Sequence, residues 1–127
     1  MATRNFVEDN DPTIAIGTRR IRWSGLLQGD DGNVIQAGNL SDKTVQFWGT
    51  FGTATAVFQG TNDTTAATSP STAAWETVSD PQGNPVSKLL ATTPKGESVT
   101  ENYEFYRPLI TGGDGTTNIT CGLNAKG

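Results

Sequence analysis

Short runs in which apolar and polar residues alternate recur along this chain, with turn residues between them. In "TVQFWGTFG", residues 44–52, Val45, Phe47 and Phe51 share one face. Trp48 falls on the opposite, polar face. Alternation with a period of two is typical of a strand that buries one side, and no segment has a convincing helical period. The pattern therefore predicts an all-β protein.

Other segments also alternate between apolar and polar residues and are predicted to be strands. One of them contains Pro108, which has no N–H to donate to a neighbouring strand, so we predict a sheet edge or a bulge there. Residues 63–74 are low in complexity and predict a long exposed loop, after which Trp75 opens a short strand. Residues 87–91 are compatible with a strand or with one helical turn. The remaining predicted strands are 14–27, with Ile21, Trp23, Gly25 and Leu27 on one face, 53–62, 101–111 and 116–123.

Glycine marks the turns. "QGDDGN" at 28–33 predicts a tight hairpin turn, because Asp-Gly tolerates positive φ. Gly52 predicts a hairpin or a sharp bend, and "GGDG" at 112–115 a hairpin loop. A phosphate-binding loop needs a helix behind it, and the residues after Asp114 are β-branched and alternating. We expect a turn there, and at Asp30 and Asp31, rather than an ion site, since a calcium site needs several oxygen ligands.

About eight short strands, most with one apolar face, predict two antiparallel sheets packed as a β-sandwich of jelly-roll type. At 127 residues the chain suits one domain. We expect a sandwich domain over 19–127 and an N-terminal arm over 1–18, ordered either by a neighbouring chain or on its own sandwich. The predicted core includes Phe47, Phe51, Phe58, Ile119, Cys121 and Leu123.

Charge and composition restrict the function. The net charge is −4, with 9 basic and 13 acidic residues. The only basic cluster is "RRIR", whose Arg20 and Arg22 share the face opposite Ile21, and we interpret it as a solvated strand face. Nucleic acid is therefore not expected as a partner, and no run is long enough to span a bilayer, so neither is a membrane. The start of the chain does not suggest export.

No enzyme is indicated. The sequence has no histidine, which removes the commonest general base and metal ligand. Cys121 is the single cysteine and is predicted to be a small buried residue. A pair of carboxylates could hydrolyse glycosides, but no spacing singles out such a pair. We expect no cofactor and no metal.

The run 44–63, then Trp75, "DPQGNP" at 80–85 and "YRPLITGGDGTTNIT" at 106–120 resemble, in that order, a group of small proteins encoded among the head genes of tailed bacteriophages. The most specific parts are "DPQGN" at 80–84 and "RPLITGGDGTT" at 107–117. The resemblance covers residues 44–123 and departs from the pattern around 66–74 and 87–98. These relatives look like capsid decoration, or cement, proteins. The resemblance implies a jelly-roll-like sandwich without enzymatic activity that sits on the outside of the virion head.

Its implied partners are the major capsid protein and a second copy of this chain, with a dimer favoured over a trimer. For the partner interface we predict Arg4, Phe6 and Val7 of the arm, together with Arg20, Arg22 and Trp48. The alternative is a carbohydrate-binding β-sandwich module of a phage tail or fibre, in which exposed aromatic rings stack on sugars. Trp48 is the residue that favours this alternative, because it lies on the polar face of its strand.

Overall fold

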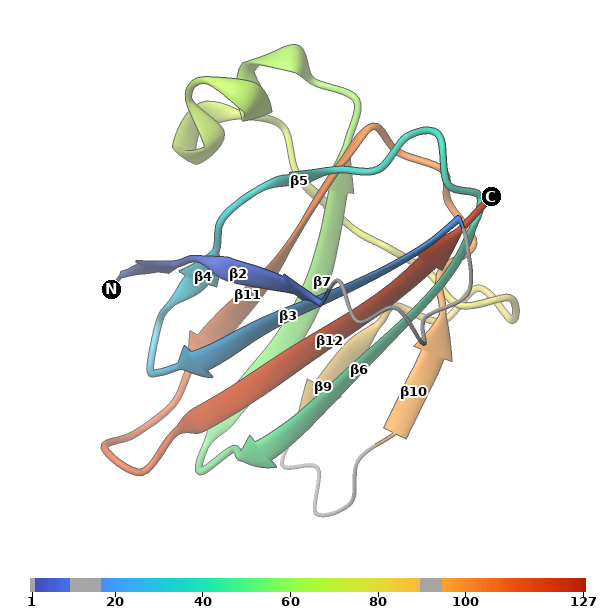
Figure 1. Ribbon diagram of the computed structural model, residues 1–127. Coiled ribbons are helices and arrows are strands. Elements are labelled where there is room, and N and C mark those ends of the chain that lie inside the picture. Colours follow the sequence, from blue (N-terminus) through green and yellow to red (C-terminus); the bar gives the residue numbers. More distant parts are fainter. Residues whose placement is uncertain (1, 10–16, 90–94) are drawn as a thin grey trace.

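The structure is a computed structural model that describes residues 2–9, 17–89 and 95–127. Its strands form two sheets packed face to face (Figure 1). The five-stranded sheet has the order β10 (Lys95–Ser98), β6 (Asp42–Thr50), β12 (Asn118–Lys126), β3 (Thr18–Leu26) and β2 (Phe6–Asp9). The seven-stranded sheet has the order β1 (Thr3–Arg4), β4 (Asp31–Gly32), β11 (Phe105–Gly112), β7 (Ala54–Thr61) and β8 (Glu76–Thr77), with β5 (Ile35–Gln36) also paired to β11 and β9 (Ser87–Leu89) to β7.

The path of the chain is that of a jelly roll. From β3 it crosses to β4 and β5, returns to β6, crosses to β7, continues through β8 and β9, and then alternates between the sheets through β10, β11 and β12. As a result β12 lies between β3 and β6, and β11 lies between β4 and β7. This confirms the predicted antiparallel sandwich of jelly-roll type. Two further strands extend its edges, β2 beside β3 and β1 in parallel beside β4.

The apolar strand faces meet between the sheets and form the core. Every residue predicted for this core is buried, which confirms the strand registers of β6, β7 and β12; the exposures are Phe47 1%, Phe51 4%, Phe58 0%, Ile119 0%, Cys121 0% and Leu123 1%. Cys121 packs as a small apolar residue, and burial raises the pKa of its thiol.

A chain of aromatic rings connects the two sheets. Trp23 of β3 is fully buried and meets Phe58 of β7 edge-on, with ring centroids 6.2 Å apart. Phe58 in turn stacks on Tyr106 of β11, at 5.7 Å and an interplanar angle of 8°. Such aromatic pairs add to the stabilisation that burial itself provides.

Lys43 is a buried cation at the end of this aromatic chain. It is 1% exposed, and its Nζ lies 5.2 Å from the centroid of the Tyr106 ring. The ammonium donates to the backbone oxygen of Leu40 and to Oδ1 of Asn102, at 2.8 Å each. Burial lowers the pKa of Lys43. These contacts replace the hydration that a cation loses inside a protein, which alternation of residue types alone could not reveal.

The prediction that Leu27 shares the face of Ile21 and Trp23 is wrong. Leu27 is 40% exposed, and Leu26 is buried in its place. Between Trp23 and Leu26, β3 advances by three residues while β12 advances by two, which is a β-bulge. Gly25 lies within it at φ 67°, a conformation that glycine adopts without strain. The extra residue moves the end of the strand to the opposite face.

Pro108 does not lie in an edge strand, because β11 has neighbours on both sides. It is paired with Phe58, whose own N–H and C=O are bonded on the other side, to Val86 and Val78. The nitrogen of Pro108 therefore points away from β7, toward the break between β4 and β5, where no ladder donor is needed. The ring packs tightly on Gly32, since a Cβ there would lie 2.6 Å from Pro108.

The predicted hairpin turns connect the two sheets instead of neighbouring strands. The turn at 28–29 leads from β3 to β4, Gly52 lies in a sharp bend from β6 to β7, and the "GGDG" loop leads from β11 to β12. Glycine and Asx signals predict where a chain turns, but they do not say whether the next strand pairs back or crosses over.

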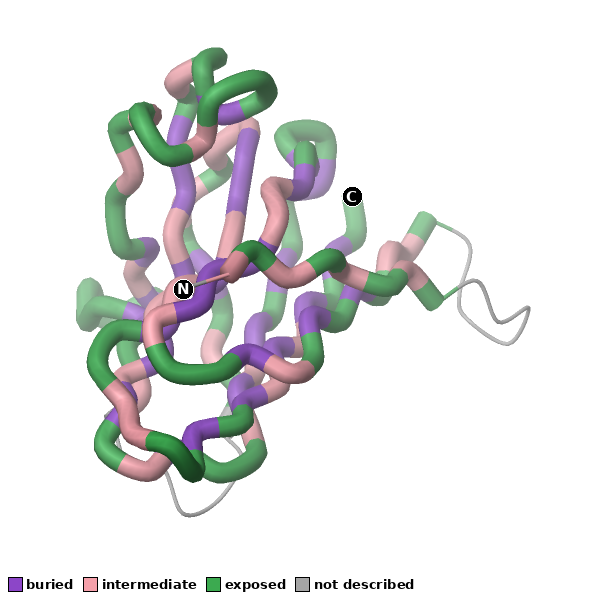
Figure 2. Tube along the Cα trace, turned by 90° about the vertical axis from the view of Figure 1, so that its left-hand side faces the viewer, coloured by how far each residue is buried: buried purple, intermediate pink, exposed green. Residues whose placement is uncertain are grey.

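The segment 63–74 is exposed along most of its length, as predicted, and stands at one end of the sandwich (Figure 2). It is not structureless, because it contains the 3₁₀ helices η1 (Thr64–Ala67) and η2 (Pro70–Thr72). Asp63 caps η1 by accepting from the N–H of Thr65. Residues 87–89 form strand β9, and Ala91 lies outside the described residues. The described part of the chain contains no helix long and apolar enough to cross a bilayer.

Truncation of Phe58 tests the core. Because its ring contacts both Trp23 and Tyr106 without solvent exposure, Phe58→Ala should lower the free energy of unfolding by about 3 to 5 kcal/mol. Urea unfolding measures this change, and a loss below about 1 kcal/mol would contradict the packing described.

The "GGDG" loop gives a second test. Gly113 has φ 112°, and a Cβ there would lie 2.9 Å from Oγ1 of Thr117. Gly113→Val should therefore destabilise the fold by about 1 to 3 kcal/mol. Asp114→Asn should change stability little, because an amide oxygen can still accept from the N–H of Thr116, at 2.8 Å in the structure. A calcium-dependent rise in Tm that Asp114→Asn abolishes would instead show an ion site.

Candidate functional site

The residues predicted to contact a partner lie in two neighbouring places. Arg4 and Phe6 hold the N-terminal arm to the body of the domain. Val7, Arg20, Arg22 and Trp48 line one groove on the outer face of the five-stranded sheet. The structure thus brings four of the six together in the groove, while Arg4 and Phe6 lie outside it.

The arm joins the edges of both sheets. Its first part, β1, pairs with β4 of the seven-stranded sheet, and its second part, β2, pairs with β3 of the five-stranded sheet. Figure 1 shows it running along one side of the sandwich. The described residues of the arm, 2–9, therefore pair with strands of the same sandwich.

Asp30 is the first anchor of the arm. It is 2% exposed and accepts hydrogen bonds from the N–H groups of Ala2 and Leu27 and from Nε of Arg4, at 2.8 to 2.9 Å. Burial by itself would raise the pKa of Asp30, but the hydrogen bonds from Arg4, Leu27 and Ala2 outweigh it and lower that pKa. A buried carboxylate with three donors holds the start of the chain in place.

Asp31 and Asn33 continue this anchoring. Asp31 accepts from Oγ1 of Thr3 at 2.6 Å and from Arg107 of β11 at 3.2 Å. Oδ1 of Asn33 accepts from the N–H of Phe6 at 2.9 Å. The sequence predicted Asp30 and Asp31 as turn residues, and their buried role was missed. Their position beside a run of donors distant in sequence becomes visible only in the fold.

Phe6, one of the predicted interface residues, packs against its own domain. Its ring packs edge-on against Trp23, with centroids 5.8 Å apart, and it lies partly buried against the core. Because β2 is antiparallel to β3, Phe6 is placed opposite Trp23 and turns inward. Phe6 therefore anchors the arm to its own domain.

Val7 points the other way and is 57% exposed. Val7 and Leu27 are the exposed large hydrophobic residues among those the structure describes. Leu27 lies beside Arg4, since both line a hollow next to Ala2. Val7 is paired with Arg22, which precedes Leu27 by five residues in the chain, and Val7 also lines the groove on the outer face of the five-stranded sheet. We call Arg4, Val7 and Leu27 together the arm edge.

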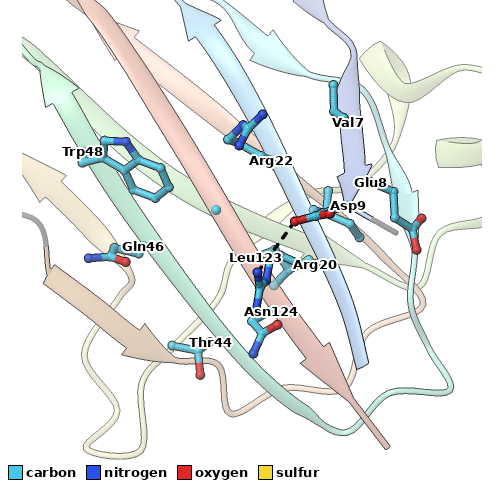
Figure 3. Close-up of a pocket in the computed structure, with 12 residues that line it drawn as sticks. Val7, Glu8, Asp9, Arg20, Arg22, Thr44, Gln46, Trp48, Leu123 and Asn124 are labelled. Carbon is cyan, nitrogen blue, oxygen red and sulfur yellow. Dashed lines mark ion pairs between the residues drawn. The ribbon is translucent and has the colours of Figure 1, made fainter. Parts of the chain in front are cut away.

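The groove crosses the five-stranded sheet beside the arm, with a volume of about 670 Å³. Figure 3 shows side chains from β2, β3, β12 and β6 around it. Its floor is Gly122 of β12, which is paired with Arg22 on one side and Gln46 on the other. A Cβ on Gly122 would lie 2.9 Å from the indole of Trp48, so this ring rests against the backbone of the floor. The groove exists because position 122 has no side chain.

Charges gather at the arm side of the groove. Arg20 and Asp9 form an ion pair of 3.7 Å between two exposed side chains. Arg22 is exposed and has no ion pair with any residue that the structure describes. Nearby, Arg19 binds both carboxylate oxygens of Glu8, at 2.7 and 3.0 Å, and these bonds lower the pKa of Glu8. An exposed ion pair such as Arg20–Asp9 contributes little to stability, so a ligand can replace it at little cost in free energy.

No protein-family model matches the chain, and no curated protein is similar to it in sequence. The fold is similar to that of the SPBc2 prophage-derived protein YomS, with a TM-score of 0.62, 10% identity, and coverage of 92% of this chain and 100% of that one. Looser matches, each with a TM-score of 0.43, are the K1 adhesin domain of Lys-gingipain from Porphyromonas gingivalis (8% identity, 97% and 83% covered) and the L-ribose isomerase of Acinetobacter sp. DL28 (7% identity, 98% and 61% covered).

The anchoring of the arm predicts a pH dependence. The pKa of Asp30 is lower in the folded chain than in the unfolded one, so its contribution is present above the unfolded value of about 3.9 and is lost as the pH falls through the folded value. Asp30→Asn should lower the free energy of unfolding at pH 7 by about 1 to 3 kcal/mol. The same substitution should have a smaller effect at pH 2, as measured by urea unfolding at both values.

Asp42→Asn is the matched control, since the Asp42 side chain is 67% exposed and lies 3.9 Å from Lys126. It should have little effect at either pH. Equal losses for Asp30→Asn at pH 7 and pH 2 would show that the carboxylate charge does not hold the arm.

Proposed function

We propose that this chain is a non-enzymatic structural protein of a tailed bacteriophage, which decorates the outside of the head and binds the major capsid protein. The observation that carries the proposal is the sequence resemblance over residues 44–123. It is supported by the jelly-roll fold, which is similar to that of a prophage-derived protein. The net charge of −4 also favours a position outside the head, away from packaged DNA.

The most specific parts of the resemblance build the frame of the domain. Asp80 of "DPQGN" is 8% exposed and accepts from the N–H groups of Gln82 and Asn84, which closes the turn after β8. Arg107 of "RPLITGGDGTT" pairs with Asp31 and lies 4.4 Å from the ring centroid of Trp75. The resemblance thus concerns the scaffold, and the capsid contact has to be sought on the surface.

The arm edge is the surface that suits a capsid contact. Val7 and Leu27 offer exposed apolar area, and Arg4 offers a cation whose side chain is 38% exposed. Interfaces of specific complexes commonly combine apolar anchors with arginine. The buried bonds of Asp30 and Asp31 hold this edge in place before binding, which reduces the entropy that binding would cost.

Repetition strengthens such a contact. Many copies on one shell, each with a modest interface, resist internal pressure together. We also propose that the chain associates with itself as a dimer, which analytical ultracentrifugation of the purified protein tests. A monomer at all concentrations would contradict this second part alone.

Introducing charge at the arm edge tests the capsid contact. The double substitution Val7→Lys, Leu27→Lys places two ammonium groups in the apolar contact and leaves the core unchanged. It should abolish co-sedimentation with empty heads of the cognate phage while the Tm stays close to that of the natural chain. The matched control is Thr111→Lys, at an exposed position near the end of β11.

Full decoration by the double variant would move the contact to another surface. Failure of the natural chain itself to bind heads, with all variants folded, would overturn the decoration function.

A further inference from the structure

The groove over Gly122 is bordered by Val7, Glu8 and Asp9 of the arm, and its lining is chemically distinctive. Trp48 offers one aromatic face. Thr44, Gln46 and Asn124 add a hydroxyl and two amides on the same outer face. Hydroxyl and amide groups around one half-buried indole suit a ligand that has both hydroxyl groups and a flat apolar face, which is the chemistry of a pyranose ring.

The backbone N–H and C=O groups at the floor of the groove already have hydrogen-bond partners within the sheet. Its floor lies on β12, which is hydrogen-bonded to β3 on one side and to β6 on the other. A peptide strand could therefore gain no ladder bonds here, because these form only at a sheet edge. Nucleic acid is disfavoured too, because a phosphate backbone needs several clustered cations, and of the two arginines in the groove Arg20 is paired with Asp9. A saccharide fits better than either polymer.

The positive charge of Arg22 favours an acidic saccharide over a neutral one. Arg22 has no carboxylate partner among the described residues, and it faces the groove from β3 while Trp48 faces it from β6 (Figure 3). These strands flank β12 and are therefore about 10 Å apart, two strand spacings. The indole of Trp48 lies over Gly122, which is paired with Arg22, so one ligand on the floor of the groove can contact both side chains. A guanidinium binds a carboxylate through two parallel hydrogen bonds.

We propose that the groove binds an acidic oligosaccharide, with a pyranose ring on Trp48 and a hexuronate carboxylate on Arg22. The inference does not rest on the decoration function, which concerns the arm edge. On a particle, a groove beside the arm edge would give the same protein a second contact, with a saccharide-bearing surface.

Isothermal titration of the full chain with oligogalacturonate tests the proposal, and maltohexaose serves as the neutral ligand of similar size. The natural chain should bind the acidic ligand more tightly, and this preference should shrink as salt is added. Trp48→Ala should weaken binding of the acidic ligand about tenfold or more. Arg22→Gln should remove the preference for the acidic ligand, while Arg22→Lys should keep part of it.

Lys126→Gln is the control for loss of a cation, because the Lys126 side chain is 57% exposed on β12 outside the groove. It should bind like the natural chain, and unfolding curves establish that each variant is folded. The proposal is overturned if neither ligand binds, or if Trp48→Ala binds as well as the natural chain. It is also overturned if Trp48→Ala and Arg22→Gln abolish head binding without any saccharide binding, since the groove would then be a protein contact.

Discussion

The packing of Trp23 is the constraint on which the rest of the structure depends. This one side chain touches the arm through Phe6, the opposite sheet through Phe58, and the segment after β4 through Nε1, which donates to Asn33 at 3.1 Å. An indole excluded from water with its N–H satisfied fixes the distance and the orientation of everything around it. The arm, the two sheets and the β4 segment therefore form one cooperative unit, and the surface features stand on a rigid base.

The arm edge and the groove both lie on this packed core, but different interactions form them. The arm edge is held by buried charge, with Asp30 and Asp31 receiving donors from the chain start and from Arg107. The groove is made by a missing side chain at Gly122, over which Trp48 lies. Electrostatics thus positions one surface and shape positions the other. Protonation of Asp30 would weaken the anchoring of the arm, and with it the side of the groove that Val7, Glu8 and Asp9 form.

The class of fold and most core positions could be predicted from the sequence, because alternation reports directly which side of a strand is buried. Phe58 and Cys121 are examples. The connections between strands could not be predicted, because the residues of the loop at Asp114 indicate a turn whether the next strand pairs with the previous one or joins the other sheet. For the site, the outward face of Trp48 and Arg22 followed from alternation, whereas the inward turn of Phe6 depended on pairing with a strand beyond a loop.

The bulge at Gly25 has a consequence for the residues that follow it. A strand has a parity, since each residue belongs to one face or the other, and one inserted residue reverses that parity for everything downstream. The insertion in β3 keeps Trp23 and Leu26 inside and delivers Leu27 to the surface. Without the bulge, a strand of the present length would place Gly25 and Leu27 on the face of Trp23 and turn Leu26 outward. The bulge, rather than a change of residue type, thus decides which of two adjacent leucines is exposed in this fold.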